Sequence, residues 1–402
     1  MSRDETSAFH LRPEAELLLS CGRAWLGSEA AERIRGFFRE DMDFEYLYRI
    51  AVQHGMVPIL YWGLHAASPS GVPPAFEKRL RDDVQASNRR NLFMTGELLK
   101  ILSLLESHHV PAVPFKGPVL AASAHANLSL RQFLDLDILI RREDVAEARK
   151  SLISLGYEPE FYRSEAQEAA FVEWASHYTF SGADKPLIVE IHWRIGSPYF
   201  CPSLALEPMW ERLERMPLGG REVLTFCPED LLLLLSAHGA RHCWERLMWI
   251  LDIARLISVP EGLDWEEVMS RARAAGVQRM LLVGLFLARR LFGVGLPGEA
   301  LESVKAARGL GPLAVRVRRR LFREVDAPVG PLERFFFHVN MMDGVGSQIR
   351  YCLRYARHVT TPTVLEWESL PLPDSLFPLY YVFRPVRLMA KYAVSLWRRV
   401  LP

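Results

Sequence analysis

The chain has 402 residues, of which 50% are apolar and 24% are charged. This composition is typical of a globular protein with two or three domains. Its formal net charge of +1 argues against a strong overall attraction to nucleic acid or acidic membranes. The five cysteines are dispersed and form no C-x-x-C pair, which argues against a disulfide framework or a cysteine zinc site and favours a reducing compartment.

The sequence predicts neither a targeting segment nor a membrane span. Its start, Met-Ser-Arg-Asp-Glu-Thr, lacks the apolar run of a signal peptide. The longest leucine run, Leu231 to Leu235, is too short to cross a bilayer. We therefore expect a cytoplasmic protein with no transmembrane segment.

The N-terminal region predicts helices throughout. Apolar residues recur at helical spacing over residues 14–26, 28–38 and 44–54. A long helical stretch then opens at Pro73-Pro74, and no strand signal interrupts it. Residues 1–108 are therefore predicted to form an N-terminal helical domain.

Strand patterns begin after Val110. The segment from Val110 to Phe115 is short, apolar and followed by a Lys-Gly-Pro turn, which indicates a strand and then a helix. Further predicted elements follow in chain order: a helix at 119–125, a strand at 133–140, a helix to about residue 155 that Gly156 ends, and a hairpin at 177–180 and 187–193. These elements predict a small mixed sheet with packed helices over residues 109–225.

Helical patterns return from Pro228 and predict a C-terminal helical domain over residues 226–402. Four stretches fit amphipathic helices: 231–242, 244–257, 265–275 and 279–292. The complete chain is thus expected to be an α+β protein, with a small sheet core between two helical domains.

Two basic clusters stand out in this last region. Arginines alternate with apolar residues from Arg316 to Arg323, as on the solvated face of an amphipathic helix, or as in a surface for an acidic acceptor, RNA or partner. The basic segment over 380–401 could lie on a membrane surface or dock onto the protein itself.

The predicted strand at 133–140 carries two acidic residues in an otherwise apolar run. Because alternate side chains of a strand share a face, Asp135 and Asp137 project together, while Leu134, Leu136 and Ile138 are expected in the core. Neighbouring buried carboxylates repel each other unless a cation lies between them. A hard divalent ion such as Mg²⁺, bound with substrate phosphates, meets this need. A purely structural D-x-D pair is the alternative.

The second strand of the predicted hairpin supplies a third carboxylate. Glu190 and His192 share one face of it. If this strand lies beside the Asp135/Asp137 strand, three carboxylates converge and can hold two divalent ions. His192 could contact substrate or simply be a packed, hydrogen-bonded histidine.

Candidate phosphate-binding residues precede the carboxylates. Gly117 at a strand-to-helix turn allows backbone amides to approach a phosphate, and Lys116 can neutralise its charge. Arg131 is placed to bind the same anion bidentately. The alternatives are a plain turn for Lys116-Gly117 and a salt bridge from Arg131 to one aspartate.

Together these motifs resemble the polymerase-β-type nucleotidyltransferase superfamily, and most closely a bacterial family of largely uncharacterised putative nucleotidyltransferases. The resemblance rests on Phe115-Lys116-Gly117, Arg131-x-x-x-Asp135-x-Asp137, Leu155-Gly156-Tyr157, Val189-Glu190-Ile191-His192-Trp193 and the region His238…His242…Trp249…Asp252. Asp135, Asp137 and Glu190 match the metal triad of the superfamily. One departure is Lys116-Gly117, which stands where the superfamily usually has Gly-Gly or Gly-Ser.

The resemblance implies metal-dependent transfer of a nucleoside monophosphate from an NTP, with ATP favoured, to an acceptor hydroxyl. Asp135 and Asp137 would bridge two Mg²⁺ ions, with Mn²⁺ as an alternative, and Glu190 would complete the site that activates the hydroxyl. Nucleic acid is not an obligatory partner, and the acceptor stays open. The rival hypothesis is an inactive nucleotide-binding regulatory or partner-binding module on the same fold.

The histidine pair His238 and His242 has the i, i+4 spacing of a two-histidine zinc site but lacks the accompanying glutamate. Contact with substrate or phosphate and simple helix packing both stay open. Asp252 is expected to cap a helix or to pair with Arg246 or Arg255.

Overall fold

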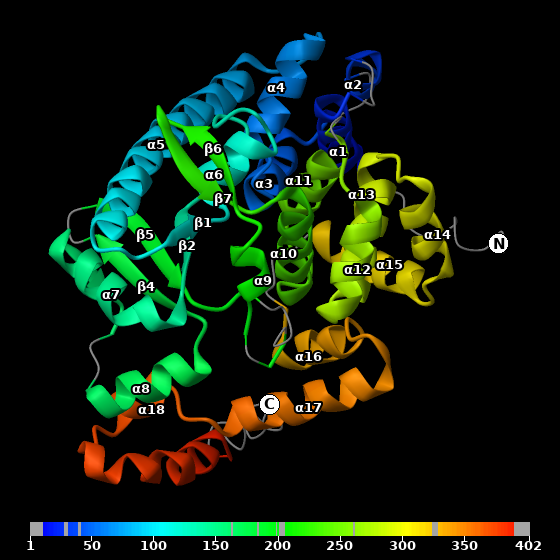
Figure 1. The fold of residues 1–402 in the computed structure, drawn as a ribbon. Helices are drawn as coiled ribbons and strands as arrows, with labels where there is room; N and C mark the ends of the chain where they lie inside the picture. The colour runs from blue at the N-terminus through cyan, green and yellow to red at the C-terminus, as the bar shows by residue number, and fades with distance from the viewer. Residues whose placement is uncertain are drawn as a thin grey trace, which may run out of the picture.

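The computed structural model describes residues 11–27, 31–38, 42–161, 164–182, 185–197, 199–200, 206–259, 262–323 and 329–389. The predicted α+β class is confirmed, because helices surround a five-stranded mixed sheet (Figure 1). Within the described ranges, no helix has both the length and the apolar character needed to cross a membrane. The end of the basic C-terminal segment, residues 390–402, lies outside these ranges.

The N-terminal region is helical, as predicted. Its helices are α1 (Pro13–Trp25), α2 (Ala31–Phe37), α3 (Phe44–Gln53), α4 (Val57–Ala67) and α5 (Pro74–Ser107). Helix α4 was not predicted. Its first turn is buried on every side, so the sequence shows no amphipathic period there.

The main sheet has the strand order β1-β2-β5-β4-β3. Its strands are β1 (Ala112–Pro114), β2 (Asp135–Ile140), β3 (Tyr157–Pro159), β4 (His177–Gly182) and β5 (Lys185–His192). Strands β2 and β5 pair in parallel, whereas the other three pairs are antiparallel. The predicted hairpin is confirmed as β4 and β5, although residues 183–184 of its turn lie outside the described residues. Its second strand, β5, pairs with the carboxylate strand β2, as predicted.

Three helices of the core accompany these strands. They are α6 (Gly117–Ser123), α7 (Val145–Ser154), preceded by the short helix η1 (Arg142–Asp144), and α8 (Glu165–Trp174). Helix α8 and strand β3 were not predicted. Leu136 and Ile138 are buried as expected, but Leu134 is 56% exposed, because β2 begins only at Asp135 and Leu134 precedes the alternating pattern.

A separate two-stranded sheet, β6 (Glu214–Leu218) with β7 (Arg221–Thr225), was also not predicted. Pro217 lowers the strand signal of β6. Gly219 and Gly220 form the turn with positive φ angles of 58° and 82°. A Gly-Gly pair between two strands is a hairpin signal, so this element was visible in the sequence.

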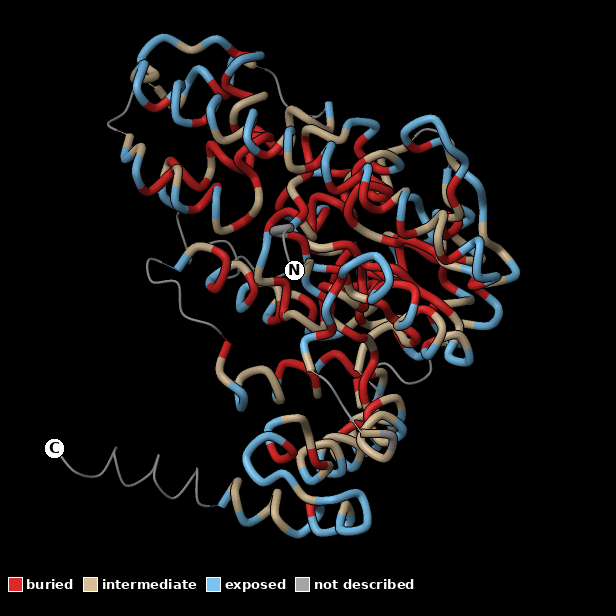
Figure 2. Tube along the Cα trace, turned by 90° about the vertical axis from the view of Figure 1, so that its left-hand side faces the viewer, coloured by how far each residue is buried: buried red, intermediate tan, exposed pale blue. Residues whose placement is uncertain are grey.

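The C-terminal region is helical, and all four helices predicted there are confirmed. Its elements are α10 (Pro228–Arg241), α11 (Leu247–Ile257), α12 (Trp265–Ala274), α13 (Gln278–Phe292), α14 (Gly298–Ala306), α15 (Leu310–Leu321), α16 (Pro331–Val339), α17 (Gly344–Thr360), α18 (Val364–Ser369) and η2 (Asp374–Leu379). The short helix α9 (Glu207–Trp210) comes earlier, before the two-stranded sheet. In Figure 2, red buried stretches concentrate in the larger body, whereas the stretch leading to the C-terminus is mostly exposed or intermediate.

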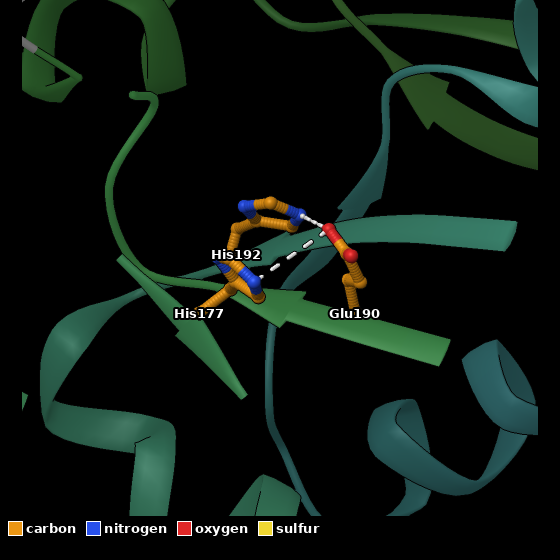
Figure 3. Close-up of side chains that lie close together, drawn as sticks. All are labelled: His177, Glu190 and His192. Atoms are coloured by element: carbon orange, nitrogen blue, oxygen red, sulfur yellow. Dashed lines mark hydrogen bonds and ion pairs between the residues drawn. The ribbon is translucent and has the colours of Figure 1, made fainter. Parts of the chain in front are cut away.

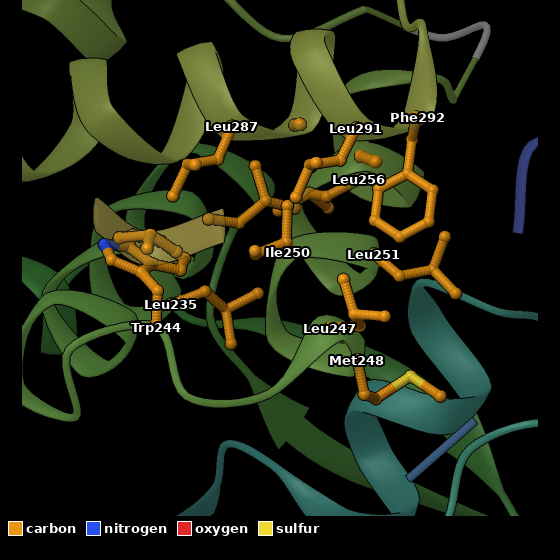
Figure 4. Close-up of a cluster of buried hydrophobic side chains, with 14 of the residues drawn as sticks. Leu235, Trp244, Leu247, Met248, Ile250, Leu251, Leu256, Leu287, Leu291 and Phe292 are labelled. Atoms are coloured by element: carbon orange, nitrogen blue, oxygen red, sulfur yellow. The ribbon is translucent and has the colours of Figure 1, made fainter. Parts of the chain in front are cut away.

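Two clusters of buried apolar residues stabilise the molecule. One joins N-terminal helices such as α1 to C-terminal helices α10, α11 and α13, and the other lies against the sheet. Figure 4 shows Trp244 among leucines of the first cluster. Trp244 has a positive φ of 57° and lies in the turn between α10 and α11, so the predicted helix at 244–257 begins later, at Leu247.

The arginine cluster lies on α15, except for Arg323, which follows the helix, and it is only partly solvated. Arg316 and Arg319 are exposed. Arg320 is buried, and its guanidinium donates to the Cys243 carbonyl at 2.8 Å and to Glu333 at 2.8 Å. One member of the predicted solvated face is therefore part of the core.

Candidate active site

The three predicted carboxylates lie on two adjacent parallel strands. Asp135 is the first residue of β2, and Asp137 follows on the same face. In the parallel register, Asp137 pairs with Glu190 of β5. The sheet itself therefore brings together side chains that are 53 positions apart in the sequence (190 minus 137).

Asp137 is the most enclosed of the three. Its Oδ1 accepts hydrogen bonds from Lys116 Nζ at 2.8 Å and from His192 Nε2 at 3.1 Å. Burial opposes ionisation of this carboxyl group, but the charge of Lys116 and the hydrogen bond from His192 outweigh it, so the pKa of Asp137 lies well below its usual value. Its Oδ2 is buried and has no hydrogen-bond partner among the described residues.

Asp135 has the opposite electrostatic character. Burial and the neighbouring charge of Asp137 raise the pKa of Asp135 above its usual value. The charge of Asp137 therefore disfavours ionisation of Asp135, and a cation near Asp135 would relieve this repulsion.

Glu190 belongs to a compact group with two histidines (Figure 3). His192 Nε2 lies 3.1 Å from Glu190 Oε2, and His177 Nε2 lies 3.9 Å from the same oxygen. Burial favours the neutral form of His192, but its hydrogen bonds to Asp137 and Glu190 raise its pKa. Burial, together with the nearby charge of His192, lowers the pKa of His177 to about 4.

The sequence analysis did not single out His177. It begins β4 and pairs with His192 in the antiparallel register between β4 and β5. The predicted hairpin already placed both residues on neighbouring strands, so this signal was present but was not used.

The Lys116-Gly117 turn lies directly against the carboxylate strand. Gly117 has a φ of 55°, and a Cβ there would lie 3.4 Å from the Asp135 carbonyl oxygen, which explains why glycine suits this position. The ammonium group of Lys116, predicted to contact a phosphate, contacts Asp137 in this structure.

Arg131 forms an ion pair with Asp252, and not with Asp135 or Asp137 of the neighbouring strand. Its Nε and Nη2 donate to the two carboxylate oxygens of Asp252 at 3.0 to 3.2 Å. His125 Nε2 lies 2.9 Å from Asp252 Oδ1. The bidentate face expected to hold a phosphate is thus occupied by Asp252. The expected pairing of Asp252 with Arg246 or Arg255 is wrong, since Arg255 Nε donates to the Ala124 carbonyl instead.

His238 of α10 and His242, the C-cap residue of that helix, lie next to each other, with ring centroids 4.7 Å apart. The ring of Trp249 lies 5.0 and 5.4 Å from them. Burial and the nearby Lys116 charge keep the pKa of His238 well below its usual value. Both histidine rings contact Trp249. His238 also lines a small cavity with Lys116 and His192, so it borders the carboxylate site.

A larger cavity of about 360 Å³ is lined in part by His177. Thr179 of β4, which pairs with Glu190 in the sheet, lines it. Aromatic side chains and one cation complete much of its wall: Phe161, Phe171, Trp174, Tyr199 and Arg241. His177 thus lines the cavity and also lies beside Glu190 of the carboxylate group.

These residues fit a divalent cation. Asp135, Asp137 and Glu190 offer oxygen ligands on one surface of the sheet, and the buried Oδ2 of Asp137 has a free lone pair for such an ion among the described residues. The histidines add nitrogen ligands beside them.

A family model described as "Uncharacterised nucleotidyltransferase" matches residues 40–293, which is more than half of the chain. The match covers the sheet and every residue of the site described above. Comparisons with curated proteins and with solved structures give no significant match.

Proposed function

Because the chain belongs to this family of uncharacterised nucleotidyltransferases, we propose that it transfers a nucleoside monophosphate from an NTP, with ATP favoured, to the hydroxyl group of an acceptor. The acceptor oxygen forms a bond to the α-phosphorus, the α–β phosphoanhydride bond breaks, and pyrophosphate leaves. The observation that carries the proposal is the pairing of Asp137 and Glu190 on adjacent strands, with Lys116 in contact.

In this proposal the residues divide the work by position. Lys116 and the Gly117 amide hold the triphosphate, with Lys116 exchanging Asp137 for a phosphate oxygen. Asp135, Asp137 and Glu190 would hold one or two Mg²⁺ ions. Such ions supply charge neutralisation for the triphosphate and acidify a bound hydroxyl group. Glu190, whose Oε2 lies 3.9 Å from the cavity-lining His177, orients the acceptor hydroxyl.

The larger cavity beside His177 supports binding of a small acceptor. A volume of about 360 Å³ lies within the range of small-molecule sites, roughly 300–1,000 Å³. Its aromatic side chains suit an acceptor with a flat or apolar body, and Arg241 suits an anionic group on it.

Filling this cavity is expected to block the acceptor but not the nucleotide. In the Thr179→Tyr variant, which keeps a residue suited to a strand, we expect unchanged Mg-ATP affinity and loss of pyrophosphate release with a panel of small hydroxylated compounds. The matched variant Thr179→Val keeps the cavity volume and should retain release. Wild-type turnover by Thr179→Tyr would place the acceptor elsewhere, and loss of ATP affinity would assign the cavity to the nucleotide.

Nucleotide binding is the first test of the proposed function. Titration calorimetry with each of the four NTPs should show binding that needs Mg²⁺ and is lost in the Asp135→Ala/Asp137→Ala double variant. The matched control is Glu143→Ala/Asp144→Ala, which removes two carboxylates from η1 outside the site and should bind like the wild type. Absence of binding by the wild type to any NTP would contradict the proposal.

The rival proposal, an inactive nucleotide-binding module on the same fold, makes a different prediction. It expects metal-dependent NTP binding without pyrophosphate release under any acceptor condition. Both hypotheses use the three carboxylates to hold the metal ion, so pyrophosphate release is the measurement that separates them.

A further inference from the structure

We propose that His177, Glu190 and His192 form a binding site for one first-row transition-metal ion, such as Mn²⁺, Co²⁺ or Zn²⁺, beside the Mg²⁺ position. The inference rests on the proposed function only in that the two sites share Glu190 and, as a fourth ligand, Asp137. It adds two nitrogen ligands, and with them a different class of metal, to a centre that the carboxylates alone would assign to Mg²⁺.

The geometry of the three side chains supports a common metal ion. One ligand atom from each residue lies within 4.8 Å of the others, and His192 Nε2 lies 3.1 Å from Glu190 Oε2 (Figure 3). Ligands bound at about 2.1 Å to one ion lie roughly 3.0–3.4 Å apart. The pair of His192 and Glu190 already has this spacing, and only His177, 3.9 Å from Glu190 Oε2, must move closer.

The second nitrogen of His177 is held in the manner of a metal ligand. Ser176 Oγ lies 3.1 Å from His177 Nδ1, on the side of the ring away from Glu190. Histidines that bind metals commonly engage their other ring nitrogen in such a hydrogen bond, which fixes the ring orientation. The ring of Phe115 packs edge-to-face with that of His192, with centroids 5.2 Å apart, and limits rotation of this imidazole by packing.

The ligand types select the class of metal. Two imidazole nitrogens and a carboxylate suit zinc, iron, cobalt or manganese, whereas Mg²⁺ prefers oxygen ligands only. Asp137 Oδ1, 3.1 Å from His192 Nε2, can serve as a fourth ligand. The Asp135 side of the cluster, with oxygen ligands alone, keeps the character of a Mg²⁺ site.

The test is a Co²⁺ titration of the chelator-treated, full-length protein, followed by visible absorption. We expect one Co²⁺ per chain with ligand-field bands, displacement by Zn²⁺, and no displacement by a large excess of Mg²⁺. The His177→Ala variant should bind Co²⁺ at least about tenfold more weakly, because even outer partners of metal ligands contribute 10- to 100-fold in affinity. His65→Ala, which removes an exposed histidine of α4, is the matched control.

Further measurements keep this inference separate from the proposed function. A second variant, His177→Gln, and circular dichroism spectra distinguish loss of a ligand from loss of the fold. Displacement of Co²⁺ by Mg²⁺, or unchanged Co²⁺ affinity in both His177 variants, would overturn the transition-metal site, whatever happens to Mg-ATP binding. Loss of NTP binding with an intact Co²⁺ spectrum would instead count against the proposed function alone.

Discussion

Replacement of Asp137 by asparagine is expected to lower the rate of nucleotidyl transfer by about 100- to 1,000-fold. This is the effect typical of removing one electrostatic group aimed at a reacting centre. Asparagine has nearly the same shape, but it removes the charge that Lys116 and His192 share and the lone pairs of the buried Oδ2. Pyrophosphate release from ATP measures the effect, and thermal unfolding reports whether the fold is intact.

The matched control for this variant is Asp144→Asn, the same chemical change on η1 outside the site. It should leave pyrophosphate release unchanged. An Asp137→Asn variant that folds and retains wild-type release would show that the paired carboxylates do not carry the reaction.

Replacement of Arg131 by methionine is expected to lower the free energy of unfolding by about 3–5 kcal/mol, the usual cost of leaving one partner of a buried ion pair alone. Asp252 is buried, with its side chain 1% exposed, and Arg131 is its bidentate partner. His125, 2.9 Å from Asp252 Oδ1, would then be left beside an unbalanced carboxylate. Urea unfolding monitored by tryptophan fluorescence measures the loss.

A double variant distinguishes a structural role of Arg131 from a role in phosphate binding. Because the pair would be removed together, Arg131→Met/Asp252→Leu should be more stable than Arg131→Met alone. If Arg131 instead binds phosphate as its main role, the single variant would keep its stability and lose Mg-ATP affinity. That outcome would contradict the structural role that its contacts indicate.

The residues that share a face on each strand of the site could be predicted from the sequence, because side chains alternate between the two faces of a strand. Alternation placed Asp135 with Asp137 and Glu190 with His192, and both pairs share faces in the structure. The partner of Arg131 could not be predicted in this way. Asp252 is 121 positions away on α11, and only the packing of that helix against the loop before β2 brings the two together.

Some of the elements that were missed have no clear period. The first turn of helix α4 is buried all round, and β3 has three residues, too few for alternation to show. The second hairpin shows a different limitation, because its Gly-Gly turn was readable but Pro217 weakened the strand before it. The division of the chain into domains at residues 108 and 225 stays a prediction.

Helix α5 has a mechanical consequence for the whole molecule. Its 34 residues correspond to a rod of about 51 Å at 1.5 Å per residue. Phe76 and Leu80 near one end pack in the cluster shared by the terminal helices, whereas Leu98 and Ile101 pack against the sheet. An uninterrupted helix resists sharp bending, so it acts as a strut that fixes the spacing between the N-terminal bundle and the sheet. Because the helix is continuous, a displacement of the N-terminal helices would be transmitted to the sheet and would not be absorbed by a flexible connection.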